Sequence, residues 1–418
     1  MTQFRFRKAV APLRTTPART AAESATHPTV DALVRAERPT DPVHCLRPAA
    51  IEGAARRFLA GFPGEVLYAV KCNPEPAVLR ALWRGGVRHF DCASSAEISV
   101  VRTMFPDAAI HFMHPVKARP AIREAYARHD VRDFVLDSAD ELAKILQETE
   151  GAEDLGLFVR LALPKGSARY DLSGKFGAPP EEAARLLRAA RGHAATLGIS
   201  FHVGSQCMDP DAYRRAIALA GEVIAASGVQ VDVLDVGGGF PQRYPDLEPP
   251  PLERFFAAIG EAFTALGLPA TRLWAEPGRA LVASGTSVVV QVQLRRGTSL
   301  YVNDGVYGSL SDAGAPGFRF PVRLITAAEA SSNDNGPLGD DQLDYDLFGP
   351  TCDSADHMKG PFPLPAAVAE GDWIEIGQLG AYGACLRTGF NGFDRARLVV
   401  VSDQPLMPGA ETALGAAA

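Results

Sequence analysis

Hydrophobic residues between positions 43 and 281 recur in two alternating patterns. Short apolar runs predict buried strands at 66–71, 89–94, 110–115, 133–138, 156–161, 200–205, 231–237 and 273–278. Between them, apolar residues at helical spacing predict helices at 77–84, 96–104, 121–129, 139–148, 180–197, 210–227 and 252–266. Ser94 with Glu97, and Ser138 with Glu141, have the spacing of a capping box, which marks two helix starts. Eight strands, each followed by a helix or turn, predict an α/β fold, a (β/α)8 barrel over residues 43–281.

After residue 281 the strands follow one another without a long helix between them. Runs of β-branched or alternating residues predict strands at 287–294, 300–304, 321–326, 345–348, 373–376 and 397–402. We therefore expect a mostly antiparallel β domain, formed by residues 27–42 and 282–405. Residues 327–342 are predicted to form a polar exposed loop, and the Pro/Ala/Gly-rich residues 406–418 a flexible tail.

Length and composition agree with this two-domain organisation. A chain of 418 residues, 47% of them hydrophobic, is long enough for a barrel plus a second domain with a sizeable core. No apolar run approaches the ~20 residues that a membrane helix needs. The net charge of −7 and the pI near 5.8 give no indication of a nucleic-acid or membrane partner.

The six cysteines are scattered and form no CxxC pair: Cys45, Cys72, Cys92, Cys207, Cys352 and Cys385. This usage is typical of a reducing compartment rather than of a disulfide framework or a zinc site, so we expect a cytoplasmic protein without a metal. Residues 1–26 are basic and rich in Ala and Thr, but they lack the apolar segment of a secretory signal. A disordered tail is favoured over an organelle transit peptide, which the composition also allows.

Polar residues gather at the predicted carboxyl ends of the barrel strands, where barrels of this kind place their chemistry. In chain order they are Lys71, Asp91, His114, Asp137, Arg160, His202 with Ser205, glycines 237–239, and Glu276 with Arg279. A purely structural barrel is not expected to carry an amine, an imidazole, a carboxylate and an anion site in one ring. The ring therefore predicts an active site.

Lys71 ends the first predicted barrel strand, shortly before Asn73-Pro74. A buried strand rarely carries a lysine, because an unpaired ammonium is costly to desolvate. One interpretation is that its tip reaches solvent at the strand end. The other is an amine that burial keeps partly neutral, so that it can form a Schiff base. The segment alone leaves both open.

Glycines 237–239 after the seventh strand and Arg279 after the eighth predict a phosphate site. The glycines let backbone N–H groups approach phosphate oxygens, and the arginine adds a bidentate charge. A triple glycine is otherwise a flexible turn, but its position favours phosphate. A phosphate site opposite a lysine is the arrangement that pyridoxal 5′-phosphate requires, with Glu276 placed to keep the pyridine nitrogen protonated. His202 has the position to lie against the ring, although a lone histidine is more often an ordinary core residue.

Eight motifs resemble those of the fold-III pyridoxal-phosphate decarboxylases of basic amino acids, and within that family they are most similar to ornithine decarboxylases. They are YAVKCNPEP (68–76), FHVGSQ (201–206), DVGGGFP (235–241), AEPGRALVA (275–283), YVNDGVYGSL (301–310), FGPTCDSAD (348–356), GAYGA (380–384) and FNGF (390–393). They extend over nearly the whole ordered chain in the family's order. The resemblance implies a barrel plus a β domain, and a head-to-tail homodimer with active sites at the interface.

Carried over by position, the resemblance implies that Lys71 forms the Schiff base with the cofactor, His202 stacks on its ring, and Glu276 pairs with its pyridine nitrogen. It further assigns the phosphate to Ser205, Gly238, Gly239, Arg279 and Tyr382, and places Asp91 and Arg160 along the cofactor.

Cys352 and Asp353 are implied to enter the neighbouring subunit's active site. Cys352 resembles the acid that reprotonates the α-carbon after CO2 leaves, and a thiol with an unperturbed pKa of ~8.5 is mostly protonated at neutral pH. A cysteine is otherwise usually a small buried hydrophobe. Asp353 matches the anion that binds the distal ammonium of the substrate, and Tyr307 is a further substrate-binding candidate.

Two features bear on the substrate. Diaminopimelate decarboxylases usually read CES where this chain has residues 352–354, CDS, and they carry an Arg-Pro-rich segment where it has residues 303–310, NDGVYGSL. Both differences favour ornithine or lysine. Eukaryotic ornithine decarboxylases follow YGSF with a run ending in Tyr-Asp, and the Asp of this run also binds the distal amine of the substrate. Residues 311–316 here read SDAGAP instead. Our hypothesis is that Asp312 takes the place of that Asp and supplies a second carboxylate, besides Asp353, for the distal ammonium. Since one methylene is worth only ~1–3 kcal/mol of discrimination, lysine is retained beside ornithine.

Other classes of function were weighed against this one. A non-catalytic relative similar to antizyme inhibitors would keep the fold and lose the cofactor, which the retention of Lys71, Glu276, Arg279, Cys352 and Tyr382 argues against. An amino-acid racemase on the same scaffold is disfavoured because the GPTCD motif belongs to decarboxylases. The prediction is therefore decarboxylation of L-ornithine to putrescine, with L-lysine to cadaverine as a second reaction and diaminopimelate decarboxylase as the alternative.

Overall fold

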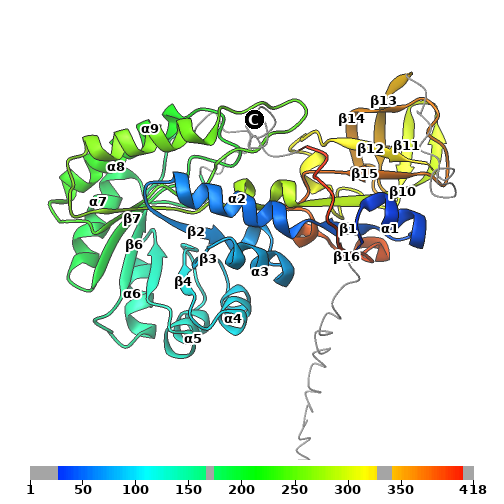
Figure 1. Ribbon diagram of the computed structural model, residues 1–418. Coiled ribbons are helices and arrows are strands. Elements are labelled where there is room, and N and C mark those ends of the chain that lie inside the picture. The colour runs from blue at the N-terminus through cyan, green and yellow to red at the C-terminus, as the bar shows by residue number, and fades with distance from the viewer. Residues whose placement is uncertain (1–26, 166–173, 327–340, 408–418) are drawn as a thin grey trace, which may run out of the picture.

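The computed structural model of the chain describes residues 27–165, 174–326 and 341–407. Figure 1 shows a barrel wrapped by helices beside a second body made mostly of strands. The predicted N-terminal tail, residues 408–418 of the predicted C-terminal tail and residues 327–340 of the predicted polar loop lie outside the described residues.

Eight parallel strands close into a barrel in chain order, each paired with the next and the last with the first. They are β2 (Glu65–Ala69), β3 (His89–Cys92), β4 (Ala109–Phe112), β5 (Asp133–Leu136), β6 (Gly156–Arg160), β7 (Thr196–Ser200), β8 (Val233–Asp235) and β9 (Arg272–Ala275). The helices between and after them are α3 (Pro76–Arg84), α4 (Ser95–Met104), α5 (Arg119–His129), α6 (Ala139–Glu148), α7 (Pro180–Arg191), α8 (Asp211–Ser227), α9 (Leu252–Ala265) and α10 (Arg279–Val282). The predicted (β/α)8 fold is confirmed.

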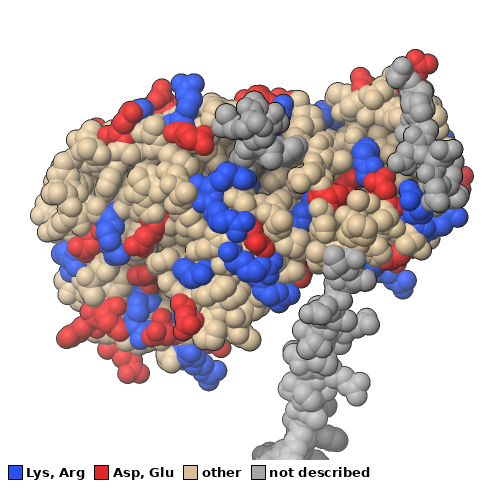
Figure 2. All heavy atoms as spheres, viewed as in Figure 1, with Lys and Arg blue, Asp and Glu red and all other residues tan. Residues whose placement is uncertain are grey.

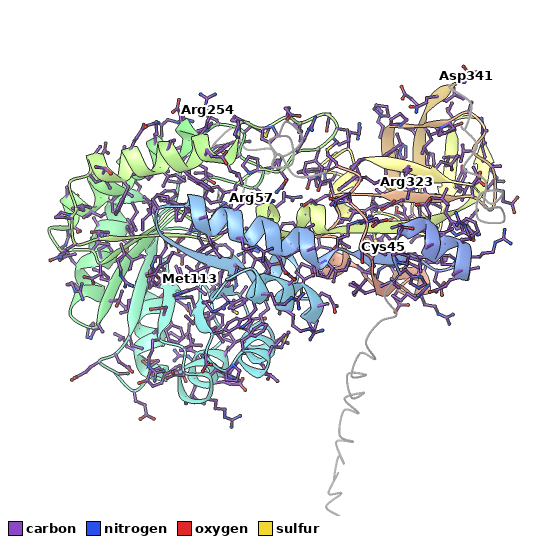
Figure 3. The ribbon with its side chains drawn as sticks, in the orientation of Figure 1. Cys45, Arg57, Met113, Arg254, Arg323 and Asp341 are labelled. Carbon is purple, nitrogen blue, oxygen red and sulfur yellow. The ribbon has the colours of Figure 1, made fainter. Side chains whose placement is uncertain are left out.

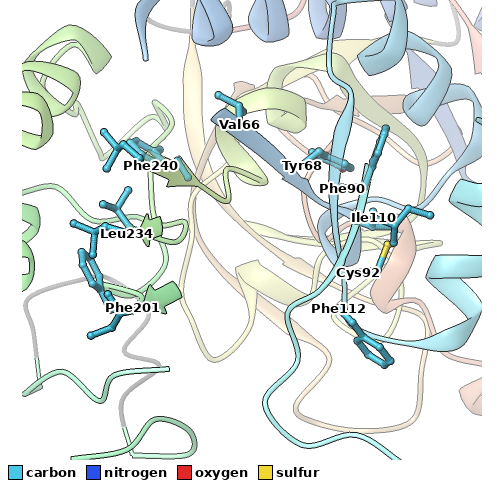
Figure 4. Close-up of a cluster of buried hydrophobic side chains, with 14 of the residues drawn as sticks. Val66, Tyr68, Phe90, Cys92, Ile110, Phe112, Phe201, Leu234 and Phe240 are labelled. Carbon is cyan, nitrogen blue, oxygen red and sulfur yellow. The ribbon is translucent and has the colours of Figure 1, made fainter. Parts of the chain in front are cut away.

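Most barrel strands send alternate side chains to two different cores, because successive residues of a strand face opposite sides. Tyr68, Phe90 and Ile110 belong to the large core that includes residues of the surrounding helices (Figure 4). A smaller separate cluster contains Leu67, Met113, Val135, Phe158, Val233 and Trp274. This cluster fills the barrel interior, so the polar strand ends rest on a packed apolar layer rather than on an open pore.

Seven barrel strands lie within three residues of their predicted bounds, and one prediction was wrong. The sixth strand was predicted at 200–205, but β7 covers Thr196–Ser200. The helical pattern had been extended to residue 197, whereas α7 ends at Arg191 with Gly192 as its C-cap. His202 and Ser205 nevertheless follow the carboxyl end of the strand directly. Both predicted helix starts are confirmed, with the Ser94 and Ser138 hydroxyls accepting from the N–H of Glu97 and Glu141. The carboxylates of Glu97 and Glu141 accept from the N–H of Ala93 and Lys117 instead of from the cap residues, so the reciprocal half of each capping box is not formed.

The β domain is one sheet with the order β12-β15-β10-β11-β13-β14, to which β1 and β16 are attached through β10. Its strands are β1 (Val43–Leu46), β10 (Thr286–Arg296), β11 (Ser299–Val302), β12 (Val322–Ile325), β13 (Gln342–Phe348), β14 (His357–Pro365), β15 (Trp373–Ile376) and β16 (Arg397–Val400). All pairs are antiparallel except β1 with β16 and β11 with β13. The sheet is thus mostly antiparallel, as predicted.

The structure moves the start of the barrel domain. The prediction began that domain at residue 43, but β1 pairs with β10 and β16, so these residues belong to the sheet of the β domain. The chain then enters the barrel through α2 (Pro48–Gly61). Among the elements that had not been predicted are β1 and α2 themselves, α1 (Val30–Glu37), and β14, whose prolines disfavour a strand in any sequence-based reading.

Acidic and basic side chains are interspersed over the face of the molecule in Figure 2. Within residues 27–165, 174–326 and 341–407, no helix has both the length and the apolar character that a membrane span requires.

Candidate active site

A pocket of about 1140 Å³ opens at the carboxyl ends of the barrel strands. Nine residues predicted to bind the cofactor line it: Lys71, Arg160, His202, Ser205, Gly238, Gly239, Glu276, Arg279 and Tyr382. The tenth, Asp91, is buried behind this wall and accepts a hydrogen bond from Lys71. Barrel strand ends that are up to about two hundred residues apart in the chain thus meet around one cavity.

Lys71 lies in a short 3-10 turn, Val70–Cys72, directly after β2. Its Nζ is 2.7 Å from Oδ2 of Asp91, and its side chain is 44% exposed because it opens into the pocket. Burial opposes the charge, but the nearby carboxylate of Asp91 outweighs it and raises the pKa of Lys71 above its usual value. The structure therefore does not support an amine kept neutral by burial, because it pairs the Lys71 amine with Asp91.

His202 is a neutral imidazole. Burial and the nearby cations Arg160 and Lys71 hold the pKa of His202 well below its usual value. Its Nδ1 accepts a hydrogen bond of 2.9 Å from the N–H of Gly204, which leaves the proton on Nε2. A neutral ring fixed in this way presents a flat, uncharged face to the pocket.

Glu276 follows β9 and carries a carboxyl oxygen, Oε1, that is buried without a hydrogen-bond partner. Burial and the carboxyls of Asp235 and Asp91 raise the pKa of Glu276 well above its usual value. Asp235 ends β8 and is itself fully buried, with Oδ1 accepting from the N–H of Gly237 at 2.8 Å. A buried polar atom without a partner is costly, so this carboxyl is poised to pair with a cationic donor that enters the pocket.

The glycines after β8 allow a backbone approach that other residues cannot. Gly239 has φ +102°, and a Cβ there would lie 2.4 Å from the carbonyl oxygen of Gly204. At Gly238 a Cβ would lie 2.6 Å from the carbonyl oxygen of Glu276 and 3.1 Å from Nε2 of His202. Only glycine fits at these two positions, which leaves the floor of the pocket made of backbone.

Arg279, the first residue of α10, is buried beside the glycines. Its Nη1 donates to the hydroxyl of Tyr244 at 2.8 Å and its Nη2 to Asp312 at 2.9 Å, while Nε has no partner. Tyr382 stands next to it with φ +55°, which a tyrosine rarely adopts, and its N–H donates to the carbonyl oxygen of Cys72. That bond ties Tyr382 of the β domain to the turn that holds Lys71.

Cys352, Asp353 and Tyr307 form a second group, in the β domain. Cys352 is exposed, and the Tyr307 hydroxyl donates to Oδ2 of Asp353. None of the three lines the barrel pocket of the same chain; Cys352 and Asp353 instead line a hollow with Tyr301 and Phe348. The hydrogen bonds from Tyr307 and from the N–H of Ala355 lower the pKa of Asp353, so it is ionised at neutral pH.

The two halves of the chain match two parts of one family. Residues 49–283 match the family described as "Pyridoxal-dependent decarboxylase, pyridoxal binding domain", and residues 233–380 match its "C-terminal sheet domain". The chain belongs to the pyridoxal-dependent decarboxylases.

Relatives of known name share most of their length with this decarboxylase. A lysine/ornithine decarboxylase from Selenomonas ruminantium is 33% identical over 353 residues, 81% of this chain and 84% of its own. An ornithine decarboxylase from Schizosaccharomyces pombe is 34% identical over 348 residues, 79% and 76%. The structure of lysine/ornithine decarboxylase from Vibrio vulnificus complexed with cadaverine has TM-score 0.76 at 31% identity, covering 90% of this chain and all of that one. Antizyme inhibitor 2 from Xenopus laevis is 32% identical over 374 residues, 81% and 76%.

The residues of this decarboxylase fit pyridoxal phosphate. The unpartnered carboxyl oxygen of Glu276 matches a protonated pyridine nitrogen, and the unpartnered Nε of Arg279 matches a phosphate oxygen. The two glycines leave room for phosphate against the backbone, and Lys71 supplies an amine. Together these features match three parts of the cofactor: the pyridine nitrogen, the phosphate and the aldehyde that an amine attacks.

Sequence reasoning missed two residues that shape the pocket. Asp235 raises the pKa of Glu276, and Tyr244 anchors Arg279. Asp235 was detectable in principle, since it opens the DVGGGFP motif at a strand end. Tyr244 lies in a loop without a motif of its own, so no sequence signal pointed to it.

Proposed function

We propose that the protein decarboxylates L-ornithine to putrescine and CO2, with L-lysine as a second substrate giving cadaverine. The observation that carries this proposal is the single pocket in which the amine of Lys71, the buried carboxyl of Glu276 and the guanidinium of Arg279 face one cavity. The names of the relatives, which include ornithine and lysine/ornithine decarboxylases, support the substrate class.

Bound pyridoxal phosphate supplies the electron sink that takes up the electron pair left when CO2 departs. The chain's own residues prepare for it. Lys71 offers the amine for covalent attachment, and Asp91 orients that amine. Glu276 would hold the proton of the pyridine nitrogen, and neutral His202 would lie against the ring without adding charge. The phosphate would be bound by Ser205, Arg279, Tyr382 and the backbone at Gly238 and Gly239, and Arg160 would line the cofactor.

The proposal includes a homodimer with shared active sites. Cys352 and Asp353 lie outside the pocket of their own chain, and exposed apolar side chains surround them: Leu386, Phe390 and Phe393 are 44–46% exposed. Asn391, between the two phenylalanines, accepts from the N–H of Cys352, and Phe390 packs on Tyr307 with ring centroids 5.0 Å apart. In the pocket of the other subunit, Cys352 would return a proton to the α-carbon and Asp353 would bind the distal ammonium.

A mixing experiment tests the shared sites. Lys71→Ala and Cys352→Ala homodimers are each expected to be nearly inactive. After they are mixed and allowed to exchange subunits, mixed dimers contain one intact site, so activity is expected to rise toward a quarter of the wild-type value. Absence of any recovery, with subunit exchange verified by differently tagged chains, would refute shared sites.

The substrate is tested by CO2 release from ornithine, lysine, arginine and diaminopimelate under identical conditions with saturating cofactor. Ornithine or lysine turnover well ahead of the other two is the expected result. Diaminopimelate ahead would overturn the assignment of Asp353 as the anion for a distal ammonium.

A regulatory protein without catalysis is the second candidate, because antizyme inhibitor 2 is similar to this chain at comparable identity. The two functions differ in cofactor binding. We expect a visible absorbance band when pyridoxal phosphate is added to the cofactor-free protein, and its absence in the Lys71→Ala variant. No band in the wild type would favour the regulatory role.

The proposed cytoplasmic location rests on the cysteine usage and is tested by cell fractionation.

A further inference from the structure

We propose that Asp312 is a positioning residue for Arg279 in phosphate recognition, and that it does not bind the distal ammonium of the substrate. This inference rests on the proposed function, since it takes the barrel pocket to be the pyridoxal phosphate site.

Asp312 is held against Arg279 by a charge-assisted hydrogen bond of 2.9 Å between Oδ2 and Nη2. The exposed fractions of the two side chains are 10% and 5%, so solvent screens the pair little. Asp312 comes from the 3-10 turn Ser311–Ala313 of the β domain, whereas Arg279 opens α10 of the barrel. The ion pair therefore joins the two domains at the edge of the pocket.

Counting donors indicates how Arg279 faces the phosphate. A guanidinium has five N–H donors in one plane. Tyr244 takes one from Nη1 and Asp312 takes one from Nη2, and the buried Nε has no partner. Two anchors at the ends of a planar fork fix its rotation, so the direction of the Nε–H bond is set before the ligand arrives.

Aromatic rings complete this fixed geometry. The guanidinium carbon of Arg279 lies 4.8 Å from the ring centroid of Phe318 and 5.1 Å from that of Tyr382. The N–H of Phe318 donates to the backbone carbonyl of Asp312 at 2.9 Å, so the same short segment supplies both the counter-ion of Arg279 and one of the two aromatic rings that contact it. The sequence departure after Leu310 thus has a local structural consequence at Arg279.

Three observations argue against a direct role for Asp312 in binding an amine. Its side chain is not among the residues that line the pocket. Its Oδ2 is already paired with a buried guanidinium. A substrate ammonium that approached it would also meet the positive charge of Arg279, at a cost that rises with burial. Recognition of the distal ammonium is accordingly left to Asp353 of the neighbouring subunit.

The test compares two ligands that differ only in the phosphate. Cofactor-free enzyme is titrated with pyridoxal phosphate and with pyridoxal, followed by absorbance and tryptophan fluorescence. Asp312→Ala is expected to weaken pyridoxal phosphate binding by about 10-fold, the size expected from loosening one charge-assisted contact, while pyridoxal binding changes less than about 2-fold. Asp312→Asn keeps an acceptor for Nη2 and is expected to lose no more than about 3-fold.

Kinetics at saturating cofactor supply the second readout. The KM for ornithine and the ratio of ornithine to lysine turnover are expected to stay unchanged in both Asp312 variants. An ornithine KM raised by about 10-fold with unchanged affinity for pyridoxal phosphate would overturn the proposal and make Asp312 an amine receptor. Equal weakening of pyridoxal and pyridoxal phosphate binding would also overturn it, because general loosening does not discriminate the phosphate.

Two further variants keep the test decisive. Tyr244→Phe removes the other anchor of Arg279 and is expected to show the same selective loss, even if Asp312→Ala does not fold. Asp31→Ala breaks a different Asp–Arg pair, with Arg323 in the β domain, and is expected to leave both affinities unchanged. Arg323 lies far from Met113 of the barrel pocket in Figure 3. A wild-type enzyme that binds neither ligand would overturn the proposed function itself, which distinguishes that failure from a failure of the present inference.

Discussion

Replacing Glu276 by glutamine is expected to have opposite effects on the cofactor-free and the cofactor-bound protein. Burial, Asp235 and Asp91 raise the pKa of Glu276 well above its usual value, so in the folded, cofactor-free protein its carboxyl holds a proton that the unfolded chain loses near pH 4.3. Folding therefore takes up a proton above that pH. By linkage, the free energy of unfolding falls as pH rises, until the pKa of the folded state is passed.

The size of this change in the free energy of unfolding follows from the uptake of one proton. Full uptake corresponds to about 1.4 kcal/mol per pH unit, so between pH 5 and 7 this carboxyl lowers the free energy of unfolding by up to about 3 kcal/mol. Glu276→Gln has the same shape and no ionisation, and it is expected to remove this slope. Asp235 contributes to the raised pKa of Glu276, so Asp235→Asn is expected to weaken the same slope rather than leave it unchanged.

In the cofactor-bound enzyme the same change removes the anion that holds the pyridine proton. A hydrogen bond to a charged group is worth about 1.5–3 kcal/mol, so kcat is expected to fall about 10- to 100-fold. Urea unfolding of the cofactor-free variant at pH 5, 6, 7 and 8 measures the first effect, and steady-state CO2 release measures the second. An unchanged pH slope, or a Glu276→Gln enzyme with wild-type kcat, would refute the assignment of this carboxyl.

Three other predictions concern other parts of the barrel. Gly239→Ala places a Cβ 2.4 Å from the Gly204 carbonyl oxygen at φ +102°, so the affinity for pyridoxal phosphate is expected to fall at least 10-fold. An unchanged titration with pyridoxal phosphate would contradict binding of the phosphate by the backbone at Gly238 and Gly239. Burial and His111, whose Nε2 is 3.0 Å from Nδ1 of His89, lower the pKa of His89. The contribution of His89 to stability is therefore present above about pH 6.5 and lost as pH falls. His89→Gln is expected to reduce the slope with which the free energy of unfolding in urea falls toward acid pH. Burial lowers the pKa of Lys117 to about 8, and its Nζ lies 3.0 Å from the buried carboxylate of Glu141. Lys117→Met removes one of the two cations paired with Glu141, whose other oxygen stays paired with Lys144, and is expected to cost about 1–3 kcal/mol, which Lys117→Met/Glu141→Gln should partly restore.

The order and type of the barrel elements could be predicted because the signal is local. Apolar periodicity, proline at first turns and capping boxes act within a few residues, so seven strands were placed within three residues of their observed bounds. The ring of site residues followed from one topological rule, since parallel strands of a closed barrel end on the same face. The same local logic failed at β7, where a helical pattern was read through Gly192, and at β14, where prolines concealed a strand.

The partners and charge states of the site residues were decided only by the tertiary structure. Lys71 read as a candidate neutral amine until Asp91, twenty residues away in the chain, was found 2.7 Å from its Nζ. The sequence suggested Asp312 as a substrate ligand, and only the fold shows that it lies against Arg279, thirty-three residues away. The barrel domain was predicted to begin at residue 43, whereas the fold pairs residues 43–46 with β10, because the chain order alone carries no information about which sheet a segment joins. Periodicity depends on neighbours in the chain, whereas ion pairs and pKa values depend on distances and burial between distant segments, and only folding sets those.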